Sequence, residues 1–190
     1  MNLRCEAGTL RSNQDRVEVI HVVSCGAVLL IALLAFAATS RRWPARDRLV
    51  GWLCWAGHVA ASFAMLWIIE NLYGGIGDAM SYLRQGELLA EYARIDLVDH
   101  VPQLVSLVFR GAPALPFDLP SIGSSTSAMA GLAGLMMLVL DSIWAANLAM
   151  SMLAFGGQVA LFLAIARLLP LEARSRIAPA MLLLPSVVFW

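Results

Sequence analysis

Asp78 is the residue whose type and position best suit chemistry. It follows Gly74-Gly75-Ile76-Gly77, a glycine-rich break after a long apolar stretch, and it precedes a segment with helical periodicity. A carboxylate at this position can cap the helix that begins there. It can also act as a general base on a hydroxyl at the membrane–water boundary. The residues around Asp78 leave both roles open.

Three arginines follow in the same segment: Arg84, Arg94 and Arg110. Each can bind a phosphate or lie as a solvated charge at the membrane surface. The sequence contains no glycine-rich phosphate loop, no HExxH and no GxSxG motif. The three cysteines form no CxxC pair, so neither a zinc site nor a disulfide framework is expected. No cofactor is predicted, and the sequence gives no support for a divalent metal.

The elements that position these residues are expected to be membrane helices. The chain is 60% hydrophobic and only 14% charged, well outside the range of soluble domains. Residues 19–39, 49–69 and 142–166 carry no formal charge and are long enough to cross about 30 Å of hydrocarbon. We predict an all-α, multi-pass transmembrane bundle forming a single membrane domain. Residues 177–190 are typical of the start of another span, so we expect the N-terminal part of a longer protein.

The arginine distribution predicts the orientation of the spans. Two short links are rich in arginine and are expected to be cytoplasmic: Arg41, Arg42, Arg46 and Arg48 in one, and Arg167, Arg174 and Arg176 in the other. Residues 70–120 are then one large external loop, and the N-terminus also lies outside. Because the chain must cross an odd number of times before Arg167, residues 125–140 are expected to form a re-entrant or interfacial helix.

Within the loop, residues 79–93 and 99–109 are predicted to be helices, the first lying along the membrane surface. His21 and His58 lie within spans and are expected to make contacts between helices. Asp141 is expected to cap the helix that follows it. Gly156-Gly157 is expected to allow close packing of helices.

Several short motifs together resemble GT-C type membrane glycosyltransferases that depend on polyprenyl-phosphate sugars. The resemblance covers about residues 71–190. Its motifs are Gly77-Asp78-Ala79 with Tyr82, the polar turn Gly123-Ser124-Ser125-Thr126-Ser127, Asp141-Ser142, and Leu184-Pro185-Ser186. It implies catalytic loops on the external side, a lipid-linked sugar donor, and an acidic residue in the first external loop as catalytic base. Only Asp78 matches that position.

The resemblance also suggests substrate-binding residues. Tyr82 is one helical turn from Asp78 and is expected to line the same site, and Arg84 is expected to lie beside the lipid phosphate. Many members of the family have a second acid directly after the first, whereas this chain has Ala79. The resemblance therefore does not extend to a metal at this position.

The expected function is the transfer of a sugar from a polyprenyl-phosphate donor to an acceptor hydroxyl on the external face of a bacterial inner membrane. The piece described by this sequence is expected to be inactive alone. Its expected partners are the lipid-linked donor and membrane lipids; zero net charge argues against nucleic acid. A surface-polysaccharide polymerase or ligase is an alternative, although such proteins cluster their loop arginines. A transporter or structural subunit is another, but only His21 and His58 are ionisable groups within spans.

Overall fold

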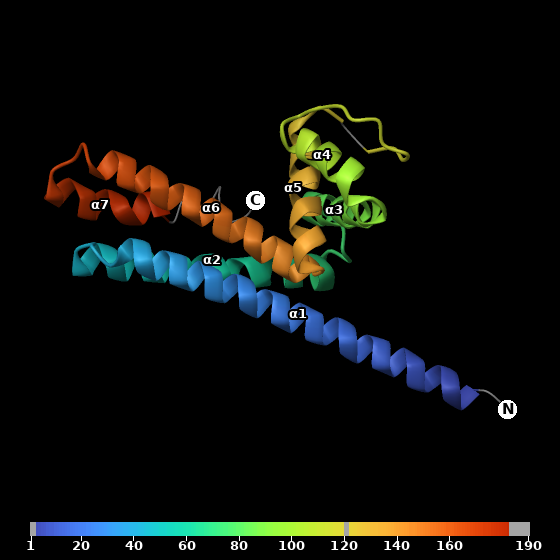
Figure 1. Ribbon diagram of the computed structural model, residues 1–190. Helices are drawn as coiled ribbons and strands as arrows, with labels where there is room; N and C mark the ends of the chain where they lie inside the picture. The colour runs from blue at the N-terminus through green and yellow to red at the C-terminus, as the bar shows by residue number, and fades with distance from the viewer. Residues whose placement is uncertain (1–2, 120–121, 183–190) are drawn as a thin grey trace.

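The computed structural model describes residues 3–119 and 122–182, and every regular element in these ranges is an α-helix (Figure 1). The helices are α1 (Leu3–Ser40), α2 (Ala45–Leu72), α3 (Asp78–Ile95), α4 (Leu97–Val108), α5 (Ser125–Leu140), α6 (Ile143–Ala166) and α7 (Leu171–Leu182). Three stretches are long and apolar enough to cross a membrane: Glu18–Ser40, Ala45–Leu72 and Ile143–Ala166. The all-α class is thus confirmed, and the three helices cover the uncharged stretches of the sequence to within one residue.

Polar side chains mark the start of three helices. Asp96 accepts hydrogen bonds from the backbone N–H groups of Val98 and Asp99 at 3.0 and 3.2 Å, which begins α4. Ser124 caps α5 and Ser142 caps α6 in the same way. The expectation that Asp141 caps α6 is wrong. Asp141 instead ends α5 in the left-handed conformation, with φ of 50°, and the cap of α6 is the next residue.

The helices form two groups (Figure 1). Helix α6 packs against α1 and α2, and α7 folds back along α2 and α6. Helices α3, α4 and α5 pack on one another at one end of this bundle, with α5 lying steeply across the direction of α6. The α1–α2 and α6–α7 links lie together at the opposite end (Figure 1). The clustered arginines lie in these links or in the first turns of the helices that follow, since α2 begins at Ala45 and α7 at Leu171. Helix α7 begins before residue 177, and the Leu184-Pro185-Ser186 motif lies outside the described residues.

An aromatic cluster packs the arginine-rich end of the bundle. The Phe36 ring lies 4.7 Å from the Trp52 ring and 5.3 Å from the Phe155 ring, measured between centroids. Gly51 lets α2 approach, because a side-chain carbon there would be only 2.7 Å from the Phe36 ring. The contacts join the last turns of α1 and the first turns of α2 to the middle of α6.

Polar groups also connect α2 with α6 inside the bundle. Asn147 donates to the Ser62 hydroxyl at 2.8 Å and to its carbonyl at 3.1 Å. The His58 Nε2 atom lies 3.1 Å from Gln158 Oε1. Apolar burial gives little driving force between helices in lipid, so packing and hydrogen bonds of this kind hold spans together. The expected helix–helix role of His58 is confirmed.

Glycines bring α3 and α5 into close contact. A side-chain carbon at Gly86 would lie 2.6 Å from the Ala133 Cβ, and one at Gly134 would lie 3.0 Å from the Leu89 Cβ. At Gly156 and Gly157, by contrast, a side-chain carbon would meet no atom within 4 Å. The prediction that this glycine pair allows close packing is therefore wrong; the close approach occurs between α3 and α5.

Candidate functional site

Asp78 is the first residue of α3 and is exposed just beyond the end of α2. Gly74 and Gly75 have φ of 62° and 76°, and the Gly75 N–H donates to the Ile69 carbonyl at 2.8 Å, so the chain turns sharply here. Gly77 occupies the cap position, and no side-chain hydrogen bond caps α3. The side-chain capping role considered for Asp78 is therefore wrong. Its carboxylate instead lies in the first turn, where the helix dipole favours negative charge.

The Asp78 carboxylate is available to a ligand. Within residues 3–119 and 122–182, it takes part in no hydrogen bond and no ion pair. A carboxylate that is exposed and unpaired has both of its oxygens free to accept hydrogen bonds from a ligand. The structure thus shows a chemically free acid at the end of a membrane-length helix.

Tyr82 and Arg84 lie on the same helix as Asp78. Tyr82 is half-buried and lies four residues along α3, which puts it on the face of Asp78. Arg84 is exposed, and its side chain folds back toward the turn before α3. A side-chain carbon at Gly75 would be 2.9 Å from Arg84 Nη2. The structure therefore brings all three predicted residues to the α2–α3 turn and the first two turns of α3.

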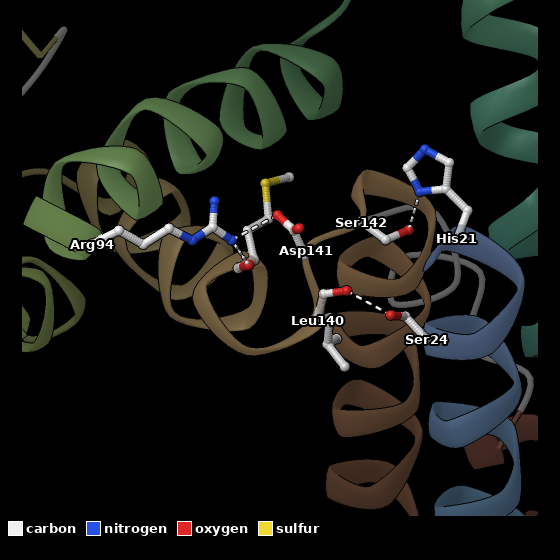
Figure 2. A network of polar contacts seen from close by, with 7 residues as sticks. His21, Ser24, Arg94, Leu140, Asp141 and Ser142 are labelled. Carbon is white, nitrogen blue, oxygen red and sulfur yellow. Dashed lines mark hydrogen bonds and ion pairs between the residues drawn. The ribbon is translucent and has the colours of Figure 1, made fainter. Parts of the chain in front are cut away.

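Arg94 is engaged elsewhere. Its Nη2 atom forms an ion pair with Asp141 Oδ1 at 2.7 Å and donates to the Met137 carbonyl at 2.9 Å (Figure 2). The Arg94 and Asp141 side chains are 41% and 60% exposed, so the pair adds little stability of its own. The Met137 carbonyl already accepts the Asp141 backbone N–H at 3.0 Å, so Arg94 adds a second hydrogen bond at the end of α5. Arg94 thus links α3 to the C-terminal end of α5.

Helix α1 contacts this same junction. The His21 Nδ1 atom lies 2.8 Å from Ser142 Oγ, and Ser24 Oγ donates to the Leu140 carbonyl at 2.6 Å (Figure 2). The expected helix–helix contact of His21 is thereby confirmed. These bonds tie α1 to the turn between α5 and α6.

A polar crevice of about 290 Å³ lies beside the junction, and sequence reasoning missed it. Its polar lining comes from three distant parts of the chain: His21, Glu87, Glu91, Arg94, Asp141 and Ser142. In the sequence, only the spacing of Glu87 and Glu91, one helical turn apart, indicated that polar groups share one face here. The α3 residues of the crevice, Glu87, Glu91 and Arg94, lie about 14–24 Å along the helix axis from Asp78, so the crevice is separate from the predicted site. In the part of the chain that the structure describes, no three His, Cys, Asp or Glu residues are grouped to hold a metal.

The α2–α3 turn thus offers a free carboxylate, a phenol and a guanidinium at the end of a membrane-length helix. Such a set can bind a phosphate and take a proton from a hydroxyl. In comparisons with models of protein families, with curated proteins and with solved structures, nothing matches this chain.

Proposed function

We propose that the chain belongs to a membrane glycosyltransferase that moves a sugar from a polyprenyl-phosphate donor to an acceptor hydroxyl. Asp78 is the proposed general base, and Tyr82 and Arg84 are the proposed substrate-binding residues. The observation that carries the proposal is the exposed, unpaired Asp78 carboxylate in the first turn of α3, directly beyond a membrane-length helix.

The position of Asp78 suits a donor anchored in the bilayer. A polyprenyl chain stays in hydrocarbon while its phosphate lies at the headgroup level, so a base that serves it belongs at the same height. Arg84 lies against the turn at Gly75, within the same short region. A guanidinium there can hold the phosphate by charge-assisted hydrogen bonds while the carboxylate takes the acceptor proton.

The proposed membrane orientation puts this site outside the cell. The arginine-rich links lie at the end of the bundle opposite α3, α4 and α5 (Figure 1), and clustered arginine favours the cytoplasmic side. On this basis residues 70–120 form an external loop of a multi-pass protein in a bacterial inner membrane. Helix α5, which packs on α3 and α4, is the proposed re-entrant or interfacial helix.

A polymerase or ligase of surface polysaccharide is less well supported. Such a function would use several loop arginines together on a pyrophosphate. Here Arg94 is paired with Asp141 at the α5–α6 junction, well along α3 from Arg84. Arg84 and Arg94 therefore do not share a site, which favours the transferase.

The test is Asp78→Asn in membranes carrying the full-length protein, assayed with a polyprenyl-phosphate-linked sugar. Because a positioned base contributes about 10²–10⁴-fold, we expect the turnover to fall by that factor while protein expression and membrane insertion stay normal. Tyr82→Phe should cost much less, since it keeps the ring and loses only a hydroxyl.

The matched control is Asp96→Asn. Asp96 is an exposed acid in the same segment, and it caps α4 through two backbone N–H groups. Asn caps helices about as well as Asp, so this variant should keep the activity of the wild type. Near-normal turnover in Asp78→Asn would refute the role of Asp78 as the base.

A further inference from the structure

The polar crevice of about 290 Å³ beside the α5–α6 turn lies where two membrane-length stretches begin. Ile20, near the start of the Glu18–Ser40 stretch, lines it, and so does Ile143, the first residue of the Ile143–Ala166 stretch. The end of a membrane-length stretch marks the boundary between the hydrocarbon and the headgroup region. On the proposed membrane arrangement, the crevice therefore lies at the level of the lipid headgroups.

The crevice contains two carboxylates without a partner. Glu87 and Glu91 line it and are exposed, and in the part of the chain that the structure describes neither takes part in a hydrogen bond or an ion pair. The charge of Asp141, by contrast, is balanced by Arg94 at 2.7 Å (Figure 2). A protonated His21 would offset only one of the two free charges. The crevice thus has an excess of negative charge, which favours a cationic ligand.

Arg94 adds unused donors to the same helix face. Its Nη2 atom donates to the Met137 carbonyl and to Asp141, whereas its Nη1 and Nε atoms have no partner among the described residues. Glu87, Glu91 and Arg94 follow one another at four and three residues, so they form one row along α3 with about 5–6 Å between neighbouring Cβ atoms. The row has two negative charges followed by one positive group.

We propose that the crevice binds the phosphoethanolamine headgroup of a phospholipid, with the ammonium between Glu87 and Glu91 and the phosphate at Arg94. A primary ammonium has three donors, which the two carboxylates can accept. Its phosphate is joined to it by a short two-carbon linker, which suits the single helical turn from Glu91 to Arg94. The guanidinium holds the phosphate by charge-assisted hydrogen bonds. This site does not involve Asp78 and does not depend on the proposed transferase.

The lining favours ethanolamine over choline. A quaternary ammonium donates no hydrogen bond and is recognised instead by the faces of aromatic rings. The described residues that line the crevice include no Phe, Tyr or Trp. Phosphatidylglycerol has the phosphate but lacks the ammonium, and soluble phosphoethanolamine has both groups but is not held at this level by a bilayer. These three compounds therefore test separate parts of the proposal.

The experiment is photo-crosslinking of the full-length protein in phosphatidylcholine nanodiscs that contain phosphatidylethanolamine with a diazirine on its acyl chain. Glu87→Gln combined with Glu91→Gln should reduce labelling about fivefold, as expected for the loss of two exposed ion pairs. The matched control is Glu70→Gln, which removes an exposed carboxylate near the end of α2, outside the crevice. This control should label as the wild type does. Unlabelled phosphatidylethanolamine should compete, whereas phosphatidylglycerol should not.

Thermal unfolding shows whether the double variant is folded. Removing two like charges four residues apart should leave its melting temperature equal to or above that of the wild type, so a loss of labelling would report the site itself. Equal labelling of the double variant and the wild type, or equal competition by phosphatidylglycerol, would overturn the proposal. Displacement by soluble phosphoethanolamine as effective as that by the unlabelled lipid would overturn the assignment to a phospholipid.

Discussion

Whether a glycine of this chain can be replaced by a larger residue depends on which atoms face it. Gly86 on α3 faces the Ala133 Cβ at 2.6 Å and the backbone of α5 at 2.9 Å, measured from an added side-chain carbon. Backbone atoms cannot move aside as the end of a flexible side chain can. Gly86 is therefore required by the close contact of α3 with α5, whereas a side-chain carbon at Gly156 would meet no atom within 4 Å.

Gly86→Ala should destabilise the protein by about 1–3 kcal/mol, since overpacking a close contact costs about that much. The measurement is thermal unfolding in detergent. Gly156→Ala adds the same methyl group to a helix where nothing opposes it, so its melting temperature should equal or slightly exceed that of the wild type. Equal melting temperatures for both variants would contradict the close α3–α5 contact.

At the scale of elements, α5 differs from the three membrane-length helices. It has 16 residues, which corresponds to about 24 Å. It packs on α3 and α4 and meets α6 at a sharp turn, where Asp141 adopts a left-handed conformation. Its first turn is polar: Ser124 is the cap, and the Ser127 hydroxyl donates to the Ser124 carbonyl. This polar turn supports the proposal that α5 is re-entrant or interfacial.

Reporter fusions after Leu140 and after Arg167 test whether α5 crosses the bilayer. If it is re-entrant or interfacial, the fusion after Leu140 reports the outside and the fusion after Arg167 reports the inside. Helix α6 is then the single crossing between them, as its 24 residues permit. A cytoplasmic signal after Leu140 would make α5 a full span and require reassignment of the inner links.

At the scale of the whole molecule, the clustered arginines and the candidate site lie at opposite ends. The α1–α2 and α6–α7 links lie at one end, and α3, α4 and α5 lie at the other (Figure 1). The Phe36–Trp52 ring contact joins α1 to α2. The three membrane-length helices connect the two ends. This arrangement permits one side of the membrane to carry the anchoring charge while the other carries the candidate site.

Single-cysteine labelling tests this orientation. On a background without the native cysteines, a cysteine at position 96 should react with an impermeant reagent from outside. A cysteine at position 46, in the first turn of α2 beside the α1–α2 link, should react only after the membrane is opened. The prediction fails if position 96 is labelled from the cytoplasmic side alone.

The sequence predicted the features that depend on local pattern, including the three long helices and the two helices after Asp78. The three long helices could be predicted because a span needs only length and apolarity. The two helices after Asp78 could be predicted from the periodicity of their apolar residues. It could not predict which glycines meet a neighbouring helix, since Gly86 and Gly156 look alike until α5 is placed. The pairing of Arg94 with Asp141 and the crevice beside it were likewise hidden, because their residues converge only in the folded chain.

The close contact between α3 and α5 also has a consequence for biosynthesis. Gly86 and its partner Gly134 are separated by roughly 50 residues, or about 2–10 s of translation. During that interval the emerging α3 has no α5 to cover Met80, Leu83 and Leu89, which are buried in the finished fold. The bilayer surface is the nearest apolar environment in which that face can be buried. We therefore expect α3 to lie on the bilayer surface until α5 covers this face.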